Sequence, residues 1–257
     1  YNRALSEAEV AALYELEKPK TTLETGLVAY YPFNGNANDE SGYENHGIVK
    51  GGVFVQDSGI NLSGSGNEYI EVPNVVLPTG SSPRTISGWV RIDDAKSGMG
   101  LFGYGNPSAG EFDSNYRVFE LIYHGATEGT VAVHYAGQNA FGSKSLEEGK
   151  WTLLTATYNG TATRLYVDGN LDKSLGDNGI DTRELVTISE KIIIGNVSYK
   201  YSGNQFAFKG NLKNIRIYNR ALSEAEVAAL YELEKPKTTI EWTKLEYLLD
   251  GNLNEKG

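Results

Sequence analysis

The sequence predicts an all-β protein. Three observations favour this class: the chain contains 30 glycines, it has few leucine-rich periodic runs, and it holds many short strand-like segments between turn-forming residues. An apolar content of 40% and 17 tyrosines provide ample material for a core. The length of 257 residues therefore fits one large β domain with appended segments.

The first half of the chain is expected to alternate strands with polar loops. Leu27–Phe33 is the first strand, and the loop after it, Asn34–Gly47, is rich in the turn formers Asn, Asp, Ser and Gly. Arg84–Ile92 shows the clearest alternation with a period of two. One face of this strand carries Ile86, Val90 and Ile92, and the other carries Thr85, Ser87, Trp89 and Arg91. Further strands are expected at residues 48–49, 59–62, 69–72, 99–104, 116–123 and 130–135.

The second half contains a predicted three-stranded meander, Trp151–Leu175. Asn159-Gly160 and Asp168-Gly169 separate its three β-rich runs, 151–158, 163–167 and 171–175. Such dipeptides favour type I′ hairpin turns, because both central residues need a positive φ. Strands at 191–195 and 212–218 are expected to complete the domain.

An exact internal repeat dominates the organisation of the chain. Tyr1–Thr22 and Tyr218–Thr239 are identical at every position. We interpret residues 1–20 as the C-terminal helix of a preceding repeat with its linker, 21–235 as one module, and 236–257 as a linker and the start of a following module. The sequence thus predicts a piece of a tandem array whose partners include neighbouring repeats.

Each copy of the repeat predicts a short amphipathic helix, one at each end of the module. Ser6 is followed three residues later by Glu9, and Ser223 by Glu226, which is the capping-box pattern of a helix N-terminus. Two roles are open for this helix: it packs on its own module, or it docks neighbouring modules together.

Composition excludes several classes of function. A net charge of −10 argues against a nucleic-acid partner, because neutralising phosphates needs clustered Lys and Arg, and it is compatible with calcium. The absence of cysteine excludes disulfides and thiolate metal sites. No apolar run approaches the roughly 18 residues that a membrane span needs.

A family resemblance follows from six runs that occur in a fixed order. They are LVAYYPFNGNANDESGYENHG, EYIEVP, TISGWVRI, GKWTLLTATYNGTATRLYVDGNL, KIIIGN and FKGNLKNIRIYNRALSEAEVAAL. Through them Gly26–Leu233 resembles laminin-G-like modules of the concanavalin A-like lectin/glucanase superfamily. The resemblance implies a jelly-roll β-sandwich of two antiparallel sheets, one of them concave. It also implies a secreted or surface-anchored protein, although a fold alone does not fix a function.

The resemblance implies a structural calcium ion where the loop after the first strand meets the last strand. The contribution of the loop maps onto Asp39, with Asn36 and Gly42 nearby, and oxygen-rich loops suit such an ion. The family's Asp on the last strand is replaced here by Lys213.

This replacement leads to a specific hypothesis. A period of two places Lys213 on the same face as Ile215 and Ile217, pointing inward, and a buried ammonium group is costly unless it is paired. We therefore expect an Asp39–Lys213 pair in place of the ion. Two alternatives remain open: a retained calcium ion, and an exposed Lys213 without a partner.

An enzymatic role is not expected. Lectin-fold glucanases carry an E-x-D-x-(x)-E pattern, whose carboxylates share one face of a strand. Here Glu111 and Asp113 fit the first half of the pattern, but Tyr116 stands in place of the second Glu. The run also lies in a segment flanked by Gly and Pro without a strand pattern.

A surface that binds glycans or other surface proteins is expected on the concave face or its rim loops. Aromatic side chains stack on sugar rings, and Asn, Asp and Arg bind hydroxyl groups. The candidates are Tyr104, Asn106, Asp113, Tyr116, Arg117, Tyr123, His134, Tyr135, Gln138 and Asn139. The alternative is that these tyrosines merely fit a half-buried sheet. The sequence thus predicts a non-enzymatic, extracellular repeat module for adhesion or carbohydrate binding, or else a building block of a surface fibre.

Overall fold

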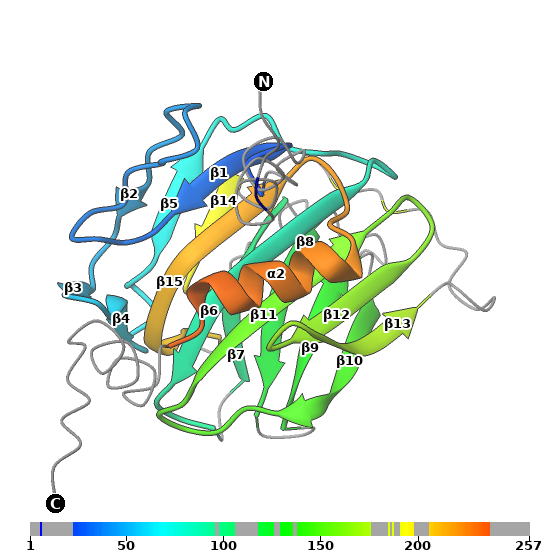
Figure 1. The fold of residues 1–257 in the computed structure, drawn as a ribbon. Helices are drawn as coiled ribbons and strands as arrows, with labels where there is room; N and C mark the ends of the chain where they lie inside the picture. Colours follow the sequence, from blue (N-terminus) through cyan, green and yellow to red (C-terminus); the bar gives the residue numbers. More distant parts are fainter. Residues whose placement is uncertain are drawn as a thin grey trace, which may run out of the picture.

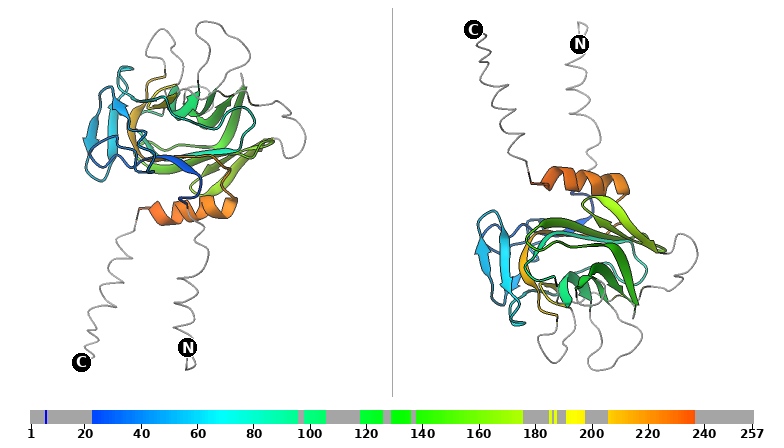
Figure 2. Two further views of the ribbon diagram at one scale, coloured as in Figure 1. Left: turned by 90° about the horizontal axis from the view of Figure 1, so that it is seen from above. Right: turned by 90° about the horizontal axis from the view of Figure 1, so that it is seen from below.

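Over the residues that it describes, the computed structural model shows a sandwich of two antiparallel sheets with one helix, α2, on an outer face (Figures 1 and 2). It describes Ser6 and residues 23–95, 98–105, 118–125, 129–135, 138–175, 185, 187, 191–197 and 206–236. The expected all-β jelly-roll class is confirmed. In the described ranges no helix is both long and apolar enough to cross a membrane.

The eight-stranded sheet carries α2. Its order is β13 (Asn170–Leu175), β12 (Thr163–Val167), β11 (Trp151–Tyr158), β6 (Arg84–Ile92), β15 (Lys209–Tyr218), β4 (Gly59–Ser63) and β3 (Val53–Val55). The long strand β15 pairs with β6 along one side. On its other side it pairs first with β4 and then with β1 (Leu27–Tyr31).

The seven-stranded sheet forms the opposite layer. Its order is β10 (Gln138–Ser145), β9 (Thr130–Tyr135), β8 (Val118–His124), β7 (Gly98–Gly105), β14 (Lys191–Ile194), β5 (Ile70–Pro73) and β2 (Ile48–Val49). Two strands, β3 and β10, were not predicted. Both are edge strands with several exposed side chains, so their sequences lack the alternation of a half-buried strand.

The core lies between the two sheets, and alternation decides which side chains enter it. On β6, Ile86, Val90 and Ile92 face the core, as expected. Trp89 belongs to a second cluster on the outer face, beneath α2. The predicted split of this strand into two faces is therefore confirmed.

One of the two predicted type I′ turns is correct and the other is wrong. Asp168 and Gly169 have φ values of 50° and 77° and join paired neighbours of β12 and β13. In contrast, Tyr158 pairs with Thr163, so a four-residue loop begins at Asn159. The Asn159 side chain explains the longer loop, because its Oδ1 accepts hydrogen bonds from two backbone N–H groups of the loop.

Helix α2 (Glu224–Glu234) begins as the repeat predicts. Ser223 and Glu226 form the capping box, in which each side chain accepts a hydrogen bond from the backbone N–H of the other residue. Val227 and Leu230 are buried against the sheet. The equivalent helix expected near the N-terminus, including Glu9, lies outside the described residues, of which only an exposed Ser6 is described there.

Candidate functional site

The outer face of the eight-stranded sheet is apolar where α2 covers it. The sheet contributes Trp89, Leu153, Tyr166 and Tyr218 to a cluster, and the chain after β15 adds Leu222, Val227 and Leu230. All of these side chains are almost completely buried. The helix is therefore an integral part of the module, because large apolar side chains on the outer face would otherwise be exposed to water.

A buried ion pair anchors the C-terminal end of α2. The Glu234 carboxylate is paired with the Arg216 guanidinium of β15 and accepts a hydrogen bond of 2.9 Å from the Trp89 indole N–H. The Arg216 guanidinium also lies 3.9 Å from the centroid of the Tyr30 ring. The side chains of Arg216 and Glu234 are only 10% and 7% exposed. Breaking such a pair on one side leaves a buried charge, so this contact fixes the helix end firmly.

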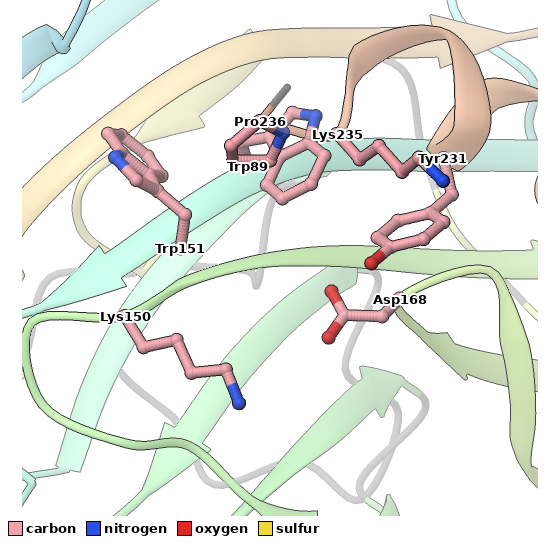
Figure 3. A pocket seen from close by; sticks show the side chains of 7 residues that line it. All are labelled: Trp89, Lys150, Trp151, Asp168, Tyr231, Lys235 and Pro236. Carbon is pink, nitrogen blue, oxygen red and sulfur yellow. The ribbon is translucent and has the colours of Figure 1, made fainter. Parts of the chain in front are cut away.

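Beside this anchor the covering helix leaves a pocket of about 410 Å³ (Figure 3). It is lined by Trp89, Lys150, Trp151, Asp168, Tyr231, Lys235 and Pro236. These residues come from β6, the start of β11, the β12–β13 turn and the end of α2. Four segments distant in sequence therefore build one hollow between the sheet and the helix.

Aromatic rings form much of the pocket. Trp89 and Tyr231 stack with their ring centroids 5.8 Å apart, and Trp89 is only 1% exposed, so it serves as the floor. Trp151 and Tyr231 remain partly exposed. Lys213 extends over Trp151, with its Nζ 4.6 Å from the ring centroid, and burial lowers the pKa of this lysine. The pocket thus offers two accessible aromatic surfaces that are fixed by their neighbours.

Asp168 is the carboxylate of the pocket, and the backbone holds it in place. Its Oδ1 accepts a hydrogen bond of 2.9 Å from the N–H of Leu153, while its Oδ2 accepts none from the described residues. Gly169 allows the helix to approach this turn, because an added Cβ would lie 3.0 Å from the Cβ of Tyr231. Figure 3 shows the Tyr231 hydroxyl and the Asp168 carboxylate pointing toward one another.

Two lysines add positive charge at the rim. Lys150 is exposed and pairs with Glu147 at 3.1 Å, a hydrogen bond that raises the pKa of the ammonium group. Lys235 pairs with Glu232 at 2.7 Å. Rings for stacking, a carboxylate that accepts hydrogen bonds and ammonium groups that donate them suit a polyhydroxylated ligand with an apolar face.

Residues 64–228 match the protein-family model described as "Concanavalin A-like lectin/glucanases superfamily". The chain belongs to this superfamily. Among curated proteins, no sequence matches it.

Three solved structures have the same fold as this chain. Domain 4 of AbnA, an extracellular GH43 arabinanase from Geobacillus stearothermophilus in complex with arabinotriose, is 20% identical, with 80% of this chain and 98% of that one covered and a TM-score of 0.59. Trypanosoma rangeli sialidase is 21% identical, with 80% and 32% covered and a TM-score of 0.60. The receptor binding domain of botulinum neurotoxin D is 20% identical, with 81% and 53% covered and a TM-score of 0.58. The chain thus spans about a third of the sialidase and half of the toxin domain.

The predicted ligand residues are not brought together on one surface. Tyr104 and Tyr123 were expected on the concave face or its rim loops, but both point into the core between the sheets. The Tyr104 hydroxyl donates to the carbonyl of Pro78 and accepts from Arg84, and the Tyr123 hydroxyl donates to the carbonyl of Ala95. The prediction was wrong for these two residues, because the inward position of each strand falls on its tyrosine.

The other predicted ligand residues divide into two groups. Asn106, Asp113, Tyr116, Arg117 and the Glu111–Tyr116 run lie outside the described residues, as do the side chains of Tyr135 and Gln138. On the outer face of the seven-stranded sheet, His134 Nδ1 lies 2.9 Å from Glu120 Oε1, and both side chains are buried. Asn139 approaches His124 at 3.5 Å, and His124 packs edge-on against Phe141.

Asp39 is buried in the loop after β1, but it is satisfied by hydrogen bonds. Its Oδ1 accepts from the N–H groups of Tyr30 and Ser41, and its Oδ2 accepts from the Ser41 hydroxyl and the N–H of Asn45. Four donors occupy the lone pairs with which a carboxylate would bind a cation. Asp39 as placed here therefore does not fit a calcium ion.

The other two residues of the expected ion site do not complete it. Asn36 Oδ1 accepts from the N–H of Asn38, and Gly42 is an exposed turn residue with a φ of 92°. No cluster of three or more His, Cys, Asp or Glu that suits a metal occurs among the residues that the structure describes.

The predicted Asp39–Lys213 pair is wrong. Lys213 pairs in register with Trp89 on the outer face, where its Nζ donates to the carbonyl of Asp57 at 3.2 Å. The reason is a bulge between Lys213 and Arg216, where Asn214 has a φ of 53°. The extra residue shifts the alternation, so that Leu212 and Ile215 both face the core while Lys213 points outward.

The residues of the pocket were not predicted as a site. One signal in the sequence could have indicated it: Trp89 alternates to the face opposite Val90, which places a large apolar ring on the outer face of the sheet. A tryptophan there requires a cover or a ligand. Nothing in the local sequence of Trp151, Asp168 or Tyr231 indicates that the fold brings them to this ring.

Proposed function

We propose that this chain is a non-enzymatic, extracellular module that binds carbohydrate in the pocket between α2 and the eight-stranded sheet, and so serves adhesion. The observation that carries the proposal is the combination of Trp151, Tyr231 and Asp168 around one hollow. Aromatic rings stack on the apolar face of a sugar, and a fixed carboxylate oxygen accepts hydrogen bonds from its hydroxyl groups.

The size and rigidity of the pocket support this ligand class. Its volume of about 410 Å³ lies at the lower end of the range of roughly 300–1,000 Å³ typical of small-molecule sites. The stacked Trp89 and Tyr231 rings and the turn that holds Asp168 keep the lining in place without a ligand. A preorganised site of this size suits one or two sugar units.

The lining of the pocket argues against glycoside hydrolysis. That reaction generally uses two carboxylates on either side of the scissile bond. Asp168 is the single carboxylate among the lining residues in the described part of the chain. A binding role therefore accounts better for the groups that are present.

The solved structures support the proposal at the level of ligand class and compartment. The arabinanase domain is in complex with arabinotriose and comes from an extracellular enzyme. A botulinum neurotoxin serotype D ligand binding domain, 17% identical with a TM-score of 0.60, is in complex with N-acetylneuraminic acid. Sugar binding and an extracellular location are therefore expected for this chain.

A binding experiment with two matched variants tests the site. The purified chain is screened on an array of plant and animal oligosaccharides, and the best ligand is titrated calorimetrically beside arabinotriose. Trp151→Ala is expected to weaken binding about 30-fold, or ~2 kcal/mol, because a stacked aromatic anchor is lost. Phe141→Ala removes a ring that is 37% exposed on the opposite sheet and is expected to leave the affinity unchanged.

The outcomes separate the two faces of the module. Loss of binding in Phe141→Ala but not in Trp151→Ala would move the site to the seven-stranded sheet and overturn the pocket assignment. A wild-type chain that binds no glycan on the array would contradict carbohydrate binding itself.

A second candidate function is a structural unit of a surface fibre. The exact 22-residue identity between Tyr1–Thr22 and Tyr218–Thr239 favours it, because equivalent units make equivalent contacts and extend into an open array. Electron microscopy of the native protein tests this candidate. Ordered fibres with a regular axial repeat would support it, and dispersed flexible beads would contradict it.

A further inference from the structure

Helix α2 rests on a defined set of contacts, which we call the α2 seat. The seat consists of Thr85, Trp89, Leu153, Tyr166 and Arg216. Thr85 accepts a hydrogen bond of 2.9 Å from the N–H of Leu222 at the entry to the helix. Arg216 and Trp89 bind Glu234 at its end. The seat therefore recognises both ends of the helix as well as its buried face.

The residues that cap α2 and those that meet the seat all have identical counterparts 217 positions earlier. The counterparts of Leu222, Ser223, Glu226, Val227, Leu230, Tyr231 and Glu234 are Leu5, Ser6, Glu9, Val10, Leu13, Tyr14 and Glu17. Because the side chains are the same, the contacts with the seat do not distinguish the two copies. The connection to the sheet differs: α2 follows β15 and is joined to it through its N-terminal end, whereas the first copy precedes β1 and is joined to it through its C-terminal end.

The connection is long enough for the first copy to reach the seat. In that position Glu17 would meet Arg216, which is the register partner of Tyr30 on β1. Leu23, six residues after Glu17, already packs against the cluster beneath α2. Six residues span up to about 20 Å when extended, and the 11-residue helix is itself only about 16 Å long.

We propose that the α2 seat is an exchange site, filled either by α2 or by the identical segment 5–18 of the same chain. A displaced α2 would be free to enter the α2 seat of another copy of the module, so exchange would join two copies. The pocket would be rebuilt in the exchanged form, because Tyr14, Lys18 and Pro19 match Tyr231, Lys235 and Pro236. This inference goes beyond carbohydrate binding and does not depend on it.

Aspartate substitutions in the full chain test exchange by stability. Leu230 is completely buried, so Leu230→Asp prevents α2 from docking. The double variant Leu13→Asp/Leu230→Asp is expected to lower the melting temperature by about 10 °C or more. If segment 5–18 takes the place of α2, Leu230→Asp alone lowers it by less than half of that amount. Leu13→Asp alone is the matched control and leaves the melting temperature unchanged. Equal drops in Leu230→Asp and in the double variant would overturn the proposal.

A charge exchange then identifies which copy holds the seat. Arg216→Glu repels Glu234 and would also repel Glu17. In Arg216→Glu/Glu17→Arg the first copy regains an opposite charge, and Arg216→Glu/Glu234→Arg is the control that shows whether the inverted pair folds. Hydrogen exchange with mass spectrometry reads the result, since Glu17→Arg gives the two otherwise identical peptides different masses.

The expected result is a transfer of protection. In Arg216→Glu/Glu17→Arg, peptides from residues 5–18 exchange about tenfold more slowly than those from 222–235, and the control shows the reverse. Rescue of folding by Glu234→Arg but not by Glu17→Arg would overturn the proposal. If neither change rescues folding, the aspartate series decides alone, because it leaves Arg216 intact. None of these outcomes bears on whether the wild-type chain binds carbohydrate, so either proposal can fail without the other.

Discussion

The two outer faces of the sandwich differ in how many large apolar side chains they carry. The eight-stranded sheet presents Trp89, Leu153, Tyr166 and Tyr218 outward, and a helix covers them. The seven-stranded sheet presents a smaller outer cluster of Ile122, Ala132 and Val197 beside the buried Glu120–His134 pair. A face with four large side chains requires a cover with its own anchors. Where that cover ends, it leaves the aromatic pocket.

The largest effect is expected from removing the Arg216–Glu234 pair, which anchors α2 on the eight-stranded sheet. Arg216→Ala leaves the buried Glu234 carboxylate without its cation, so the free energy of unfolding is expected to fall by about 3 kcal/mol. The end of α2 is also expected to become sensitive to protease, because the seat no longer holds it. Denaturant unfolding and limited proteolysis measure the two effects.

Two control variants limit the interpretation of that result. Lys150→Ala removes the exposed pair with Glu147 and is expected to cost at most about 0.5 kcal/mol. Glu120→Gln weakens the pair with His134 on the opposite face and is expected to destabilise the module without exposing α2 to protease. Equal proteolysis of α2 in Arg216→Ala and Glu120→Gln would mean that the two faces are not independent.

A smaller effect is expected for a residue that the sequence assigned to a binding face. Tyr104→Phe removes a hydroxyl that donates to Pro78 at 3.0 Å and accepts from Arg84 at 3.3 Å. Burial raises the pKa of Tyr104 to about 12, so the hydroxyl keeps its proton near neutral pH. The loss is expected to cost about 1 kcal/mol of stability and to leave glycan affinity unchanged. A drop in affinity with unchanged stability would return Tyr104 to the ligand site.

The fold could be predicted because its signals are local. Alternation in β6 and the Asp168-Gly169 turn are readable within a few residues, and both agree with the structure. The repeated capping box likewise marks the start of α2 correctly. In each case the backbone hydrogen bonds and the buried face are set by residues that are close in sequence.

The candidate site could not be predicted because its determinants are not local. The bulge at Asn214 shifts the alternation of β15 by one residue, which moves Lys213 from the core to the outer face. A bulge leaves no pattern in the side chains before it. The pocket depends on contacts between β6, β11, a turn and α2, and these contacts appear only once the strand order is known.

The variant Glu226→Gln tests how the N-terminal cap of α2 is stabilised. The hydrogen bond from Arg220 lowers the pKa of Glu226 to about 2 from its ordinary value of 4.5. The folded-state pKa is depressed, so this stabilisation is complete above pH 4.5 and is lost as the pH falls from 4.5 to 2. Glu226→Gln keeps a capping side chain but removes the charge, and is expected to cost about 1 kcal/mol at pH 7 after allowance for partial exposure.

Unfolding measured across that acid range checks the sign. The difference in stability between the wild-type chain and Glu226→Gln should shrink as the pH falls below 4.5. A difference that stays constant down to pH 2 would assign the effect to the geometry of the cap instead of its charge.

The smallest effect is expected from removing divalent cations, and it concerns the other end of the sheet. We propose that hydrogen bonds to Asp39 close the loop after β1 in place of a calcium ion, because four donors already occupy its oxygens. Excess EDTA should then leave the melting temperature unchanged. Asp39→Ala should lower stability by about 2 kcal/mol, since it leaves three partly buried backbone N–H groups, those of Tyr30, Ser41 and Asn45, without their acceptor. A fall in melting temperature with EDTA that added calcium reverses would show that the loop opens to take an ion. The end of β1 would then depend on a cation, whereas the covered face depends on Arg216.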